Sequence, residues 1–522
     1  MDKRKKSASI FSISFATGIS RILGLIREQI FAALFGATNL ADAFLVAFRI
    51  PNLLRDLFAE GALSTAFIPT FSDYLINKGK KDAFYLANLV INFLIFIIGI
   101  IIVFGFIYTG DIVKFIAPGF SSIPEKLGIT VTMTRILLPF LLFVSLASIF
   151  MGILNVHHKF FLPALAPALF NVVIIITGFI LFYLAPADNV KIIIWAVGAL
   201  IGGFVQLIIQ IPLAVKLGYR YKIVLDLFLK NEGLRRIIKL MIPAVIGLAA
   251  TQINIIVNTN LASLLATGSI AYLLYAFRLI QLPIGIFGVS IATVNTTVIS
   301  KDIAKNNIDA LKKNIAFSLK LNSFLAFPAT FGFIFLGLPV IQLIFQHGKF
   351  GLENSLNTYN ALLYYSPTLF FYAGVKIMAP VFYAVKKSYI PVISSFLAVT
   401  VNLVVSLLTY KAYGIKGLAA GLTSASIVNF LFLTTVFILF FGSLKGYRII
   451  GSILKHIFIS VLMAVSAFFI FKKLNVNFYI DTGIVILYAL IIYVFLSYVF
   501  KVEEVHNFIN IFKRKFLNEN KD

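Results

Sequence analysis

Five arginines lie inside stretches of this sequence that are otherwise apolar enough to cross a bilayer. These residues are Arg21, Arg27, Arg49, Arg55 and Arg278. An arginine at bilayer depth costs several kcal/mol, so in membrane proteins it nearly always faces a protein interior or a water-filled cavity. A guanidinium presents its N–H donors in a planar fork that matches the oxygens of a phosphate or carboxylate. The five arginines together therefore predict a cavity that binds an anion.

Glu28 accompanies the arginines of the first apolar stretch. It lies two helical turns after Arg21 and so shares a helix face with it, while Arg27 is its direct neighbour in the chain. From a cytoplasmic start near residue 7, a rise of about 1.5 Å per residue puts Arg21 about 21 Å along the helix and Arg27 about 30 Å. We therefore expect Arg21 at the middle of the bilayer or a little beyond it, and Arg27 near the outer end.

The second apolar stretch repeats the same spacing. Asp42, Arg49 and Asp56 follow one another at intervals of seven residues, with Arg55 beside Asp56 and Pro51 between them. Such ladders on two neighbouring helices can exchange ion pairs across a cavity. Alternatively, the arginines pair only with nearby acids and hold the helices together. Both interpretations stay open for Arg49 and Arg55, which have acids close by.

Arg278 and Lys376 bring positive charge from the second half of the chain. Arg278 lies about seven residues into its apolar stretch, at a depth comparable to that of Arg27. At Arg21, Arg27 and Arg278 the positive charge exceeds the nearby acid, which favours an anion site over internal pairing. Lys376 either lines the same cavity or extends to a membrane interface. Charge from both halves of the chain is what an alternating-access carrier of an anion requires.

The composition places this chain among polytopic membrane proteins. Of its 522 residues, 60% are hydrophobic and 12% are charged, the mean hydropathy is +0.99, and apolar runs recur from end to end. The formal net charge of +25 would suggest a nucleic-acid partner in a soluble protein. Here most lysines and arginines fall in loops on one side, so the positive-inside rule accounts for them and we expect no nucleic-acid partner. The absence of cysteine excludes disulfides and thiolate metal sites.

A window of about 20 residues marks fourteen candidate membrane spans. They lie at roughly 7–35, 40–57, 83–108, 127–153, 163–184, 191–214, 238–266, 271–300, 309–336, 355–385, 389–411, 415–441, 449–472 and 480–500. The basic N-terminus resembles a signal peptide, but no cleavage site of small residues follows, so we interpret it as a retained first helix. The loop lysines and arginines cluster on one side if the chain starts in the cytoplasm, which predicts that both termini are cytoplasmic.

The longest loop divides the chain between the sixth and seventh spans. We expect an N-terminal lobe of helices 1–6 at 1–214, a cytoplasmic amphipathic linker at 215–237, a C-terminal lobe of helices 7–12 at 238–441, and two extra helices with a basic cytoplasmic tail at 442–522. The linker mixes bulky apolar residues with lysine and arginine, as an interfacial helix on an anionic leaflet would. A solvated linker between two lobes is the equal alternative.

No constellation of catalytic residues is found in the sequence. It contains no phosphate-binding Gly-Lys loop, no histidine pair at metal-ligand spacing on a helix face and no nucleophile elbow. We therefore expect a protein that is not an enzyme and that uses no metal ion and no cofactor. Transport would then be passive, or driven by an ion gradient or by the membrane potential.

Several segments of the chain resemble one family of membrane proteins. The runs SRILGLIREQIFAALFG (20–36) and ADAFLVAFRIPNLLRDLFAEGALSTAFIP (41–69) are similar to the opening of the MurJ (MviN) lipid II flippases, which belong to the multidrug/oligosaccharidyl-lipid/polysaccharide exporter superfamily. Further similar segments follow in order: APGF (117–120), RILLPFLLF (135–143), ILNVHHKFFLPALAPALFN (153–171), YAFRLIQLPIGIFGVSIAT (275–293), FQHGKF (345–350) and KIMAPVFYA (376–384). The resemblance covers nearly all of the chain.

The resemblance implies a fold and a set of site residues. It implies fourteen helices in two lobes around a central cationic cavity, with a groove for an undecaprenyl tail formed by the last two helices. The family's functional arginines fall on Arg21, Arg27 and Arg278, and its acidic and polar positions fall on Glu28, Asp42, Asn52, Arg55 and Glu60. With Arg49 and Lys376, which the residue pattern adds, these form the expected substrate-binding set.

This chain departs from some family members at two places. Phe277 stands where some members have an acid, which argues against a mechanism in which an aspartate at that position neutralises Arg278. A sodium site described for some members needs acids in the seventh and eleventh helices. Neither 238–266 nor 389–411 contains one, so we do not expect that site here.

The resemblance implies that the chain flips lipid II from the cytoplasmic to the outer leaflet of the bacterial inner membrane by alternating access. With an inside-negative potential, outward movement of an anion is favoured by about 2.3 kcal/mol per charge per 100 mV, so the potential can drive it. The expected partners are lipid II and membrane phospholipid, with other cell-wall synthesis proteins as a further possibility. One alternative is another exporter of the same superfamily, either a polysaccharide-lipid flippase or an ion-coupled multidrug antiporter. An antiporter should have an acidic cavity. A further alternative is a membrane scaffold without transport.

Overall fold

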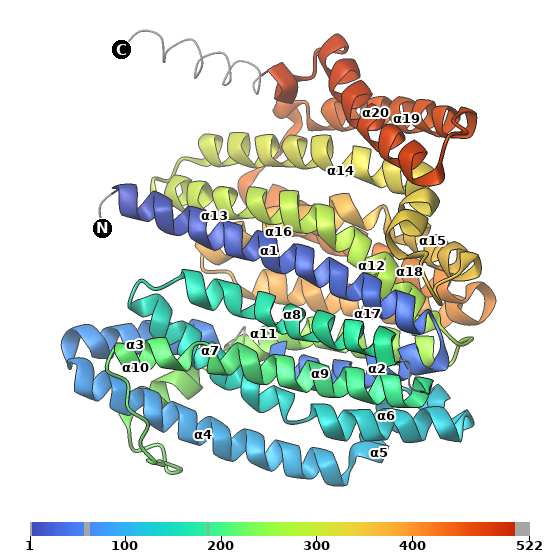
Figure 1. Ribbon diagram of the computed structural model, residues 1–522. Helices are drawn as coiled ribbons and strands as arrows, with labels where there is room; N and C mark the ends of the chain where they lie inside the picture. Colours follow the sequence, from blue (N-terminus) through green and yellow to red (C-terminus); the bar gives the residue numbers. More distant parts are fainter. Residues whose placement is uncertain (1–2, 57–62, 185–186, 507–522) are drawn as a thin grey trace. The chain divides into compact units, whose positions relative to one another are not determined.

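Helices make up the regular structure of this chain. Apolar runs of about 20 residues fold this way because, in a bilayer, a helix bonds every backbone N–H and C=O group within its own segment. The computed structural model describes residues 3–56, 63–184 and 187–506. Throughout these residues the regular elements are helical, with turns and loops between them (Figure 1).

The chain divides into two compact units, which are described separately. The first comprises residues 1–271 and 347–350, and the second comprises residues 272–346 and 351–522. The helices of the first unit are α1 (Lys3–Phe35), α2 (Asn39–Arg55), α3 (Ser64–Asn77), α4 (Lys80–Ile107), α5 (Thr109–Ile116), η2 (Pro118–Ser122), α6 (Pro124–Leu137), α7 (Phe140–Val156), α8 (Phe161–Leu184), α9 (Asp188–Ile208), α10 (Ile211–Lys216) and α11 (Glu232–Ser263).

Helix α12 (Ser269–Pro283) begins in the first unit and continues into the second. The remaining elements are the π-helical turn η3 (Ile284–Gly288), α13 (Val289–Ala304), α14 (Ile308–Phe345), α15 (Leu352–Tyr365), α16 (Thr368–Ala384), α17 (Tyr389–Tyr413), α18 (Ile415–Phe441), η4 (Lys445–Tyr447), α19 (Ile449–Lys473) and α20 (Phe478–Val499).

All fourteen predicted spans coincide with helices, and the predicted all-α membrane class is confirmed. Among the described residues, ten helical stretches are long and apolar enough to cross a membrane. The number is eleven if α15 and α16, which meet at a bend of 44°, count as one span. Helices α1, α2 and α11 are not in this set, so a total of fourteen spans stays a prediction.

The first unit is built around the packing of α1, α8 and α9, which lie side by side in Figure 1. Trp195 of α9 is buried, with its ring 5.5 Å from that of Phe31 and 5.9 Å from that of Phe35. Gly202 of α9 lets α8 approach, because an added Cβ would lie 2.9 Å from Cδ2 of Phe170. This packing fixes the part of α1 that carries Arg27, one turn before Phe31.

Helix α11 belongs to the first unit, where it packs against α3, α4 and α5. The sequence boundaries placed the span 238–266 in the C-terminal lobe. The lobes were predicted from the position of the longest loop, whereas the two units are defined by their internal packing. The lobe boundaries therefore stay a prediction.

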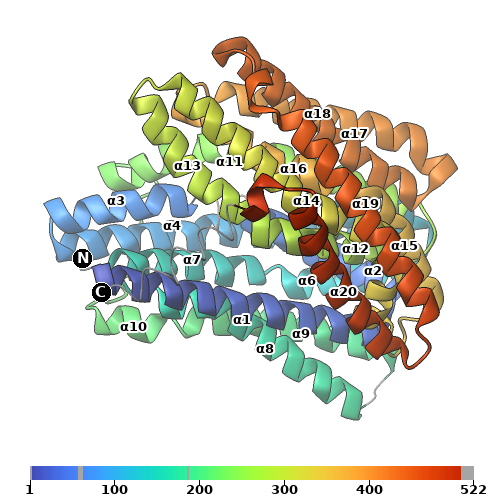
Figure 2. The same ribbon diagram turned by 90° about the horizontal axis from the view of Figure 1, so that it is seen from above.

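The second unit contains two helix pairs with extensive packing. Helices α17 and α18 form one pair, and α19 and α20 form the other, which packs on α14 (Figure 2). A buried core at this second contact contains Leu336 of α14, Ile459 and Met463 of α19, and Val485 of α20. Val502 and Val505, which follow α20, join the same core. The end of the described chain is thereby held against α14 and α19.

The loop between α10 and α11 contains no helix. Residues 217–231 form an extended run with turns, so of the two alternatives left open for this linker the structure does not form the interfacial helix. The run YRYKIVLDL at 219–227 alternates bulky and mostly polar residues, a period of two that favours an extended chain over a helix. This alternation in the sequence indicates an extended chain, which the composition of the linker does not reveal.

Candidate functional site

Arg27 and Glu28 form an ion pair on α1. The Nη2 atom of Arg27 donates to Oε1 of Glu28 over 2.5 Å, and both side chains are largely buried. The guanidinium carbon also lies 5.6 Å from the ring centroid of Phe170, within cation–π range. Phe170 is held by its packing against α9, so the aromatic face that supports the guanidinium is fixed. This arrangement orients one arginine fork through a single contact of its Nη2 atom.

Arg21, two turns earlier on α1, has a different environment. Its side chain is exposed, and within the described part of the chain it has no hydrogen-bond or ion-pair partner. The nearby backbone is anchored by Asn171 of α8, whose Nδ2 donates to the carbonyl oxygen of Ser20 over 3.1 Å. Arg21 therefore stands on a fixed helix with its charge uncompensated, as an anion-binding residue requires.

Asp42 lies at the start of α2 and is almost fully buried, with 2% of its surface exposed. Its Oδ2 accepts from Nζ of Lys126 over 3.0 Å and from the backbone N–H of Gly268 over 2.8 Å. Its Oδ1 accepts from the backbone N–H of Ala271 over 3.1 Å. The carboxylate thus caps the first turn of α12, where the helix dipole favours a negative charge. Its contacts here are structural, and binding of substrate by Asp42 stays a prediction.

Lys126 is a residue whose role the sequence did not reveal. It lies in the first turns of α6, 5% exposed, against Asp42. Its Nζ atom also lies 4.1 Å from the ring centroid of Phe120. The available signal was Pro124, which is favoured in the first turn of a helix and so marks Lys126 as helical.

Arg49 and Asn52 follow on α2. Nη1 of Arg49 donates to the hydroxyl of Thr259 on α11 over 3.1 Å, which ties two helices of the first unit together. Nδ2 of Asn52 donates to the carbonyl oxygen of Phe48 one turn earlier, over 2.9 Å. The Oδ1 atom of Asn52 is buried, and within the residues that the structure describes it accepts no hydrogen bond. A buried acceptor without a donor is costly, which makes it a candidate to bind a substrate N–H or O–H group.

Arg55 closes α2 in a short polar network. Its Nε and Nη2 atoms both donate to Oδ1 of Asp56, over 3.2 and 2.9 Å, and Nε2 of Gln252 on α11 donates to Oδ2 over 3.5 Å. The pair is partly exposed, so internal pairing occupies Arg55 without burying it. Glu60, the next predicted site residue, lies outside the described residues.

Arg278 and Lys376 belong to the second unit. Nη1 of Arg278, on α12, donates to Oε1 of Gln281 one turn later, over 3.1 Å. The ring of its neighbour Phe277 packs edge-on against Tyr365 at 5.8 Å, so the position that is acidic in some family members has an aromatic, structural role here. Nζ of Lys376, on α16, lies 5.2 Å from the ring centroid of Tyr372.

Some residues of the predicted ladders contact neighbours in the chain, and others contact residues that are far away in the sequence. The pairs Arg27–Glu28 and Arg55–Asp56 join neighbours in the chain. Asp42 and Arg49 instead contact Lys126 and Thr259, which are far away in sequence. Among the described residues there is no group of three or more His, Asp or Glu side chains that could hold a metal ion.

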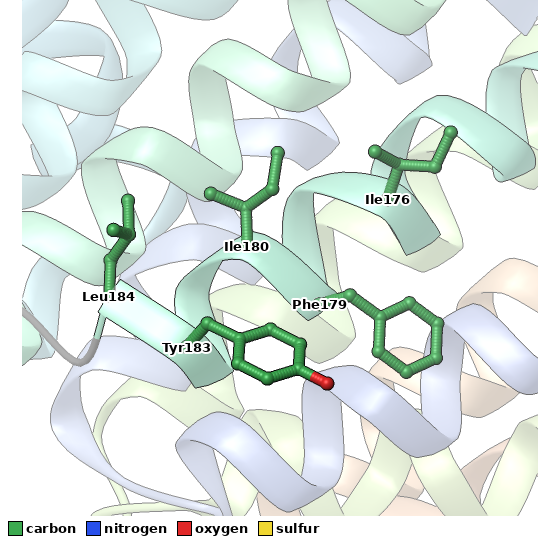
Figure 3. Close-up of a pocket in the computed structure, with 5 residues that line it drawn as sticks. All are labelled: Ile176, Phe179, Ile180, Tyr183 and Leu184. Atoms are coloured by element: carbon green, nitrogen blue, oxygen red, sulfur yellow. The ribbon is translucent and has the colours of Figure 1, made fainter.

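One shallow pocket lies on the outer face of α8 and differs in kind from these charged sites. It is lined by Ile176, Phe179, Ile180, Tyr183 and Leu184, which form two adjacent ridges on a single helix (Figure 3). All five side chains are about half exposed or more, and the lining is apolar. Such a surface suits contact with lipid chains and does not suit an anionic headgroup.

Comparison with known proteins identifies the family. The family described as "Lipid II flippase MurJ" matches residues 31–493. A probable lipid II flippase MurJ of Buchnera aphidicola subsp. Acyrthosiphon pisum (strain APS) is 37% identical over 428 residues, which are 81% of this chain and 82% of that protein. The lipid II flippase MurJ of Burkholderia cenocepacia (strain J2315) is 33% identical over 417 residues, which are 80% of each chain.

Solved structures agree with this assignment. A lipid II flippase MurJ in an inward closed conformation superposes with a TM-score of 0.80 at 29% identity, covering 94% of this chain and 99% of that one. An inward-facing multidrug resistance transporter of the MATE family superposes with a TM-score of 0.67 at 16% identity, covering 82% and 96%, and this likeness shows the fold alone. The resemblance found in the sequence is confirmed: this chain belongs to the lipid II flippase MurJ family.

Proposed function

We propose that this chain moves lipid II, an undecaprenyl-diphosphate-linked disaccharide-pentapeptide, from the cytoplasmic to the outer leaflet of the bacterial inner membrane. The observation that carries this proposal is membership of the lipid II flippase MurJ family over residues 31–493. The many apolar helices support a multi-pass membrane protein, and the distribution of loop lysines and arginines supports cytoplasmic termini. The proposed reaction is transport by alternating access, without covalent chemistry.

The proposed headgroup site uses two arginines of α1 and one of α12. Arg21, Arg27 and Arg278 bind the diphosphate, because planar forks suit its oxygens. Glu28 orients Arg27, and its charge limits how tightly that arginine holds an anion, so the headgroup can leave again. This role for Glu28 is supported by the 2.5 Å contact on α1.

The remaining residues of the set have supporting roles in this proposal. Asn52 accepts a hydrogen bond from the sugar or peptide through its buried Oδ1 atom. Arg49, Arg55 and Lys376 add to the positive potential, and Glu60 is included from the family resemblance alone. Asp42 acts by holding the first turn of α12 in place, a position supported by its contacts with Gly268 and Ala271.

The proposed energy source is the membrane potential. An outward step by a headgroup with two negative charges is favoured by about 4–5 kcal/mol at 100 mV, twice the value of about 2.3 kcal/mol per charge. No acidic residue lies in 238–266 or 389–411, so the sequence offers no carboxylate there to bind a coupling sodium ion.

The test is replacement of the proposed site arginines in a bacterium depleted of its own flippase. Arg21→Ala, Arg27→Ala and Arg278→Ala should each fail to restore growth and leave lipid II in the inner leaflet, with the protein at normal levels in the membrane. The matched control is Arg135→Ala, because Arg135 is an exposed arginine of α6 that lies over the Phe106 ring and should be dispensable. Growth with all three site variants at normal expression would exclude the anion site and favour a scaffold without transport.

A further inference from the structure

Asn88 fixes the loop after α10 against helix α4. Its Nδ2 atom donates to the carbonyl oxygen of Arg220 over 2.9 Å, and its Oδ1 atom accepts from the hydroxyl of Tyr219 over 2.8 Å. Tyr219 is buried, and burial raises the pKa of its hydroxyl above the ordinary value, so the hydroxyl stays a donor at neutral pH. One asparagine amide thus bonds both a backbone group and a side chain of the loop.

Asn92 lies one turn further along α4 and makes the same two kinds of hydrogen bond, to loop residues that come two positions later than the partners of Asn88. Its Nδ2 atom donates to the carbonyl oxygen of Lys222 over 2.9 Å, and its Oδ1 atom accepts from the hydroxyl of Tyr221 over 2.7 Å. Four residues of helix rise about 6.0 Å and two residues of extended chain about 6.6 Å, so the two repeats match. We call the four residues Asn88, Asn92, Tyr219 and Tyr221 the asparagine–tyrosine ladder.

The ladder places this loop at the edge of the membrane. Asn88 and Asn92 lie about 12 and 18 Å from the start of α4 at Lys80, and the 28-residue helix is about 42 Å long. A hydrocarbon core of about 30 Å centred on such a helix begins about 6 Å from Lys80, one turn before Asn88. Non-helical backbone at that depth needs internal hydrogen-bond partners, and the two asparagines supply them. Residues 219–222 of the loop therefore lie along α4.

Beyond the ladder the loop exposes apolar side chains. Ile223 is 85% exposed and Phe228 is 86% exposed, and the loop patch is defined by these two with Tyr221, Leu225 and Leu227, each about half exposed. Large apolar side chains at a membrane edge lose contact with water when they enter the interface, which stabilises their position there. Their exposure makes this loop suited to contact with a bilayer.

The same loop is strongly basic. Exposed lysines and arginine surround the loop patch: Lys216, Arg220, Lys222 and Lys230. The acid within it, Asp226, accepts backbone N–H bonds from Asn231 over 2.7 Å and from Lys230 over 3.1 Å, and these bonds hold the pKa of its carboxyl below the ordinary value. The carboxylate of Asp226 binds backbone N–H groups in the turn that precedes α11, so the exposed surface of the loop is cationic.

We propose that the loop patch and its basic residues form a docking surface for anionic phospholipid at the membrane face where α4 begins. The apolar side chains insert at the level of the glycerol backbone, and the lysines and arginine contact lipid phosphates. A protein partner would not need the loop to lie along a membrane span, and a solvated linker would not need the asparagine–tyrosine ladder. This lipid contact is separate from the headgroup site and does not depend on it.

The natural absence of cysteine allows a direct test with the full-length protein. Phe228→Cys is labelled with a polarity-sensitive fluorophore, and the protein is placed in nanodiscs of phosphatidylcholine or of phosphatidylcholine with phosphatidylglycerol. We expect emission at shorter wavelength, and stronger quenching by spin-labelled lipid, in the anionic discs. The control is Tyr183→Cys, at an exposed position of α8 outside the loop patch, where the described lysines Lys191 and Lys349 both pair with Asp188, so the emission should not depend on lipid charge.

Charge variants separate the electrostatic contribution from the apolar one. With Lys222→Gln and Lys230→Gln added to the labelled Phe228→Cys protein, the difference between the two lipid mixtures should shrink, as it should at high salt. A label that reports water in both mixtures would overturn the proposal. A label that reports the same apolar environment in both mixtures would overturn it as well, because the surface would then have no preference for anionic lipid.

Discussion

Lys126 and Asp42 form a buried ion pair that joins α6 to α2 and, through backbone N–H groups, to the first turn of α12. Their charged atoms are 3.0 Å apart, and neither side chain is more than 5% exposed. Burial of two charges is costly, and the cost is offset only when further hydrogen bonds complete the arrangement. The N–H groups of Gly268 and Ala271 provide this completion.

Removal of one member of this pair should destabilise the protein. Lys126→Met leaves a buried carboxylate without its counter-ion and should lower the free energy of unfolding by about 3–5 kcal/mol, whereas Asp42→Asn with Lys126→Met should recover much of that loss. Thermal unfolding in detergent measures both effects. Equal stability of Lys126→Met and the wild type would show that the pair does not contribute. If the stable double variant still failed to restore growth, a direct role of Asp42 in substrate binding would be supported.

Phosphate recognition by arginine differs from simple attraction to positive charge. Lysine at positions 21, 27 or 278 keeps the charge and loses the planar fork, so Arg21→Lys, Arg27→Lys and Arg278→Lys should restore lipid II flipping only in part. A flipping assay at matched membrane levels provides the measurement. Full activity in all three lysine variants would show that a diffuse positive field suffices.

The proposed energy source can be tested by removing the membrane potential and the sodium gradient one at a time. Collapse of the membrane potential with an ionophore should stop the appearance of lipid II in the outer leaflet even when the sodium gradient is kept. The reciprocal control is sodium-free medium with the potential intact, in which flipping should continue. Flipping that survives loss of the potential and stops without sodium would contradict the voltage-driven mechanism.

His456 connects α19 to α14 and to the segment after α20. Its Nδ1 atom lies 2.8 Å from the hydroxyl of Ser323, and its Nε2 atom lies 3.4 Å from Oε2 of Glu504, with all three residues buried. Burial alone would raise the pKa of the Glu504 carboxyl. The hydrogen bond from His456, together with the charges of His456 and Lys320, has the larger effect and holds that pKa below the ordinary value.

The lowered pKa of Glu504 predicts a loss of stability in acid. A carboxylate whose pKa is lower in the folded than in the unfolded state adds to the free energy of unfolding. This stabilisation is complete above the unfolded-state pKa and is lost as pH falls through the folded-state pKa. The unfolding temperature of the wild type should therefore fall between neutral pH and pH values below about 4 more than that of Glu504→Gln. Glu503→Gln is the companion variant, because Glu503 is 70% exposed and pairs with Lys320, so its loss leaves the Lys320 charge to act on Glu504 and should keep the loss of stability in acid. Identical pH profiles for the wild type and Glu504→Gln would contradict the expected role.

The sequence predicted the helices well, because the thickness of a bilayer sets the length of each apolar run. It left pairing of Arg55 with a nearby acid open, and Arg55 pairs with Asp56, whereas for Arg27 it favoured an anion site over the internal pairing with Glu28 that the structure shows. The contact between Lys126 and Asp42 joins residues 84 positions apart, and the contact between Tyr219 and Asn88 joins residues 131 positions apart. Periodicity within one helix gives no information on such partners, so these contacts were not predicted.

The linker after α10 shows why composition alone misled. A mixture of apolar and basic residues allowed an interfacial helix, but the alternation at 219–227 matches the period of an extended chain. The decisive residues were Asn88 and Asn92, two polar side chains in the apolar helix α4. They were not linked to the loop because nothing in the sequence indicates which backbone groups they bond.

The π-helical turn Ile284–Gly288 sets the angular phase between α12 and α13. A π-turn holds one residue more than an α-turn, so every side chain after it is rotated by about 100° from the direction that a continuous α-helix would give. This phase lets Asn295 donate to the carbonyl oxygen of Ile377 over 3.2 Å and accept from Ser318 over 2.9 Å. Deletion of a single residue from the turn would keep the helix continuous and yet turn Asn295 away from both partners, so the length of this turn is constrained more tightly than its composition.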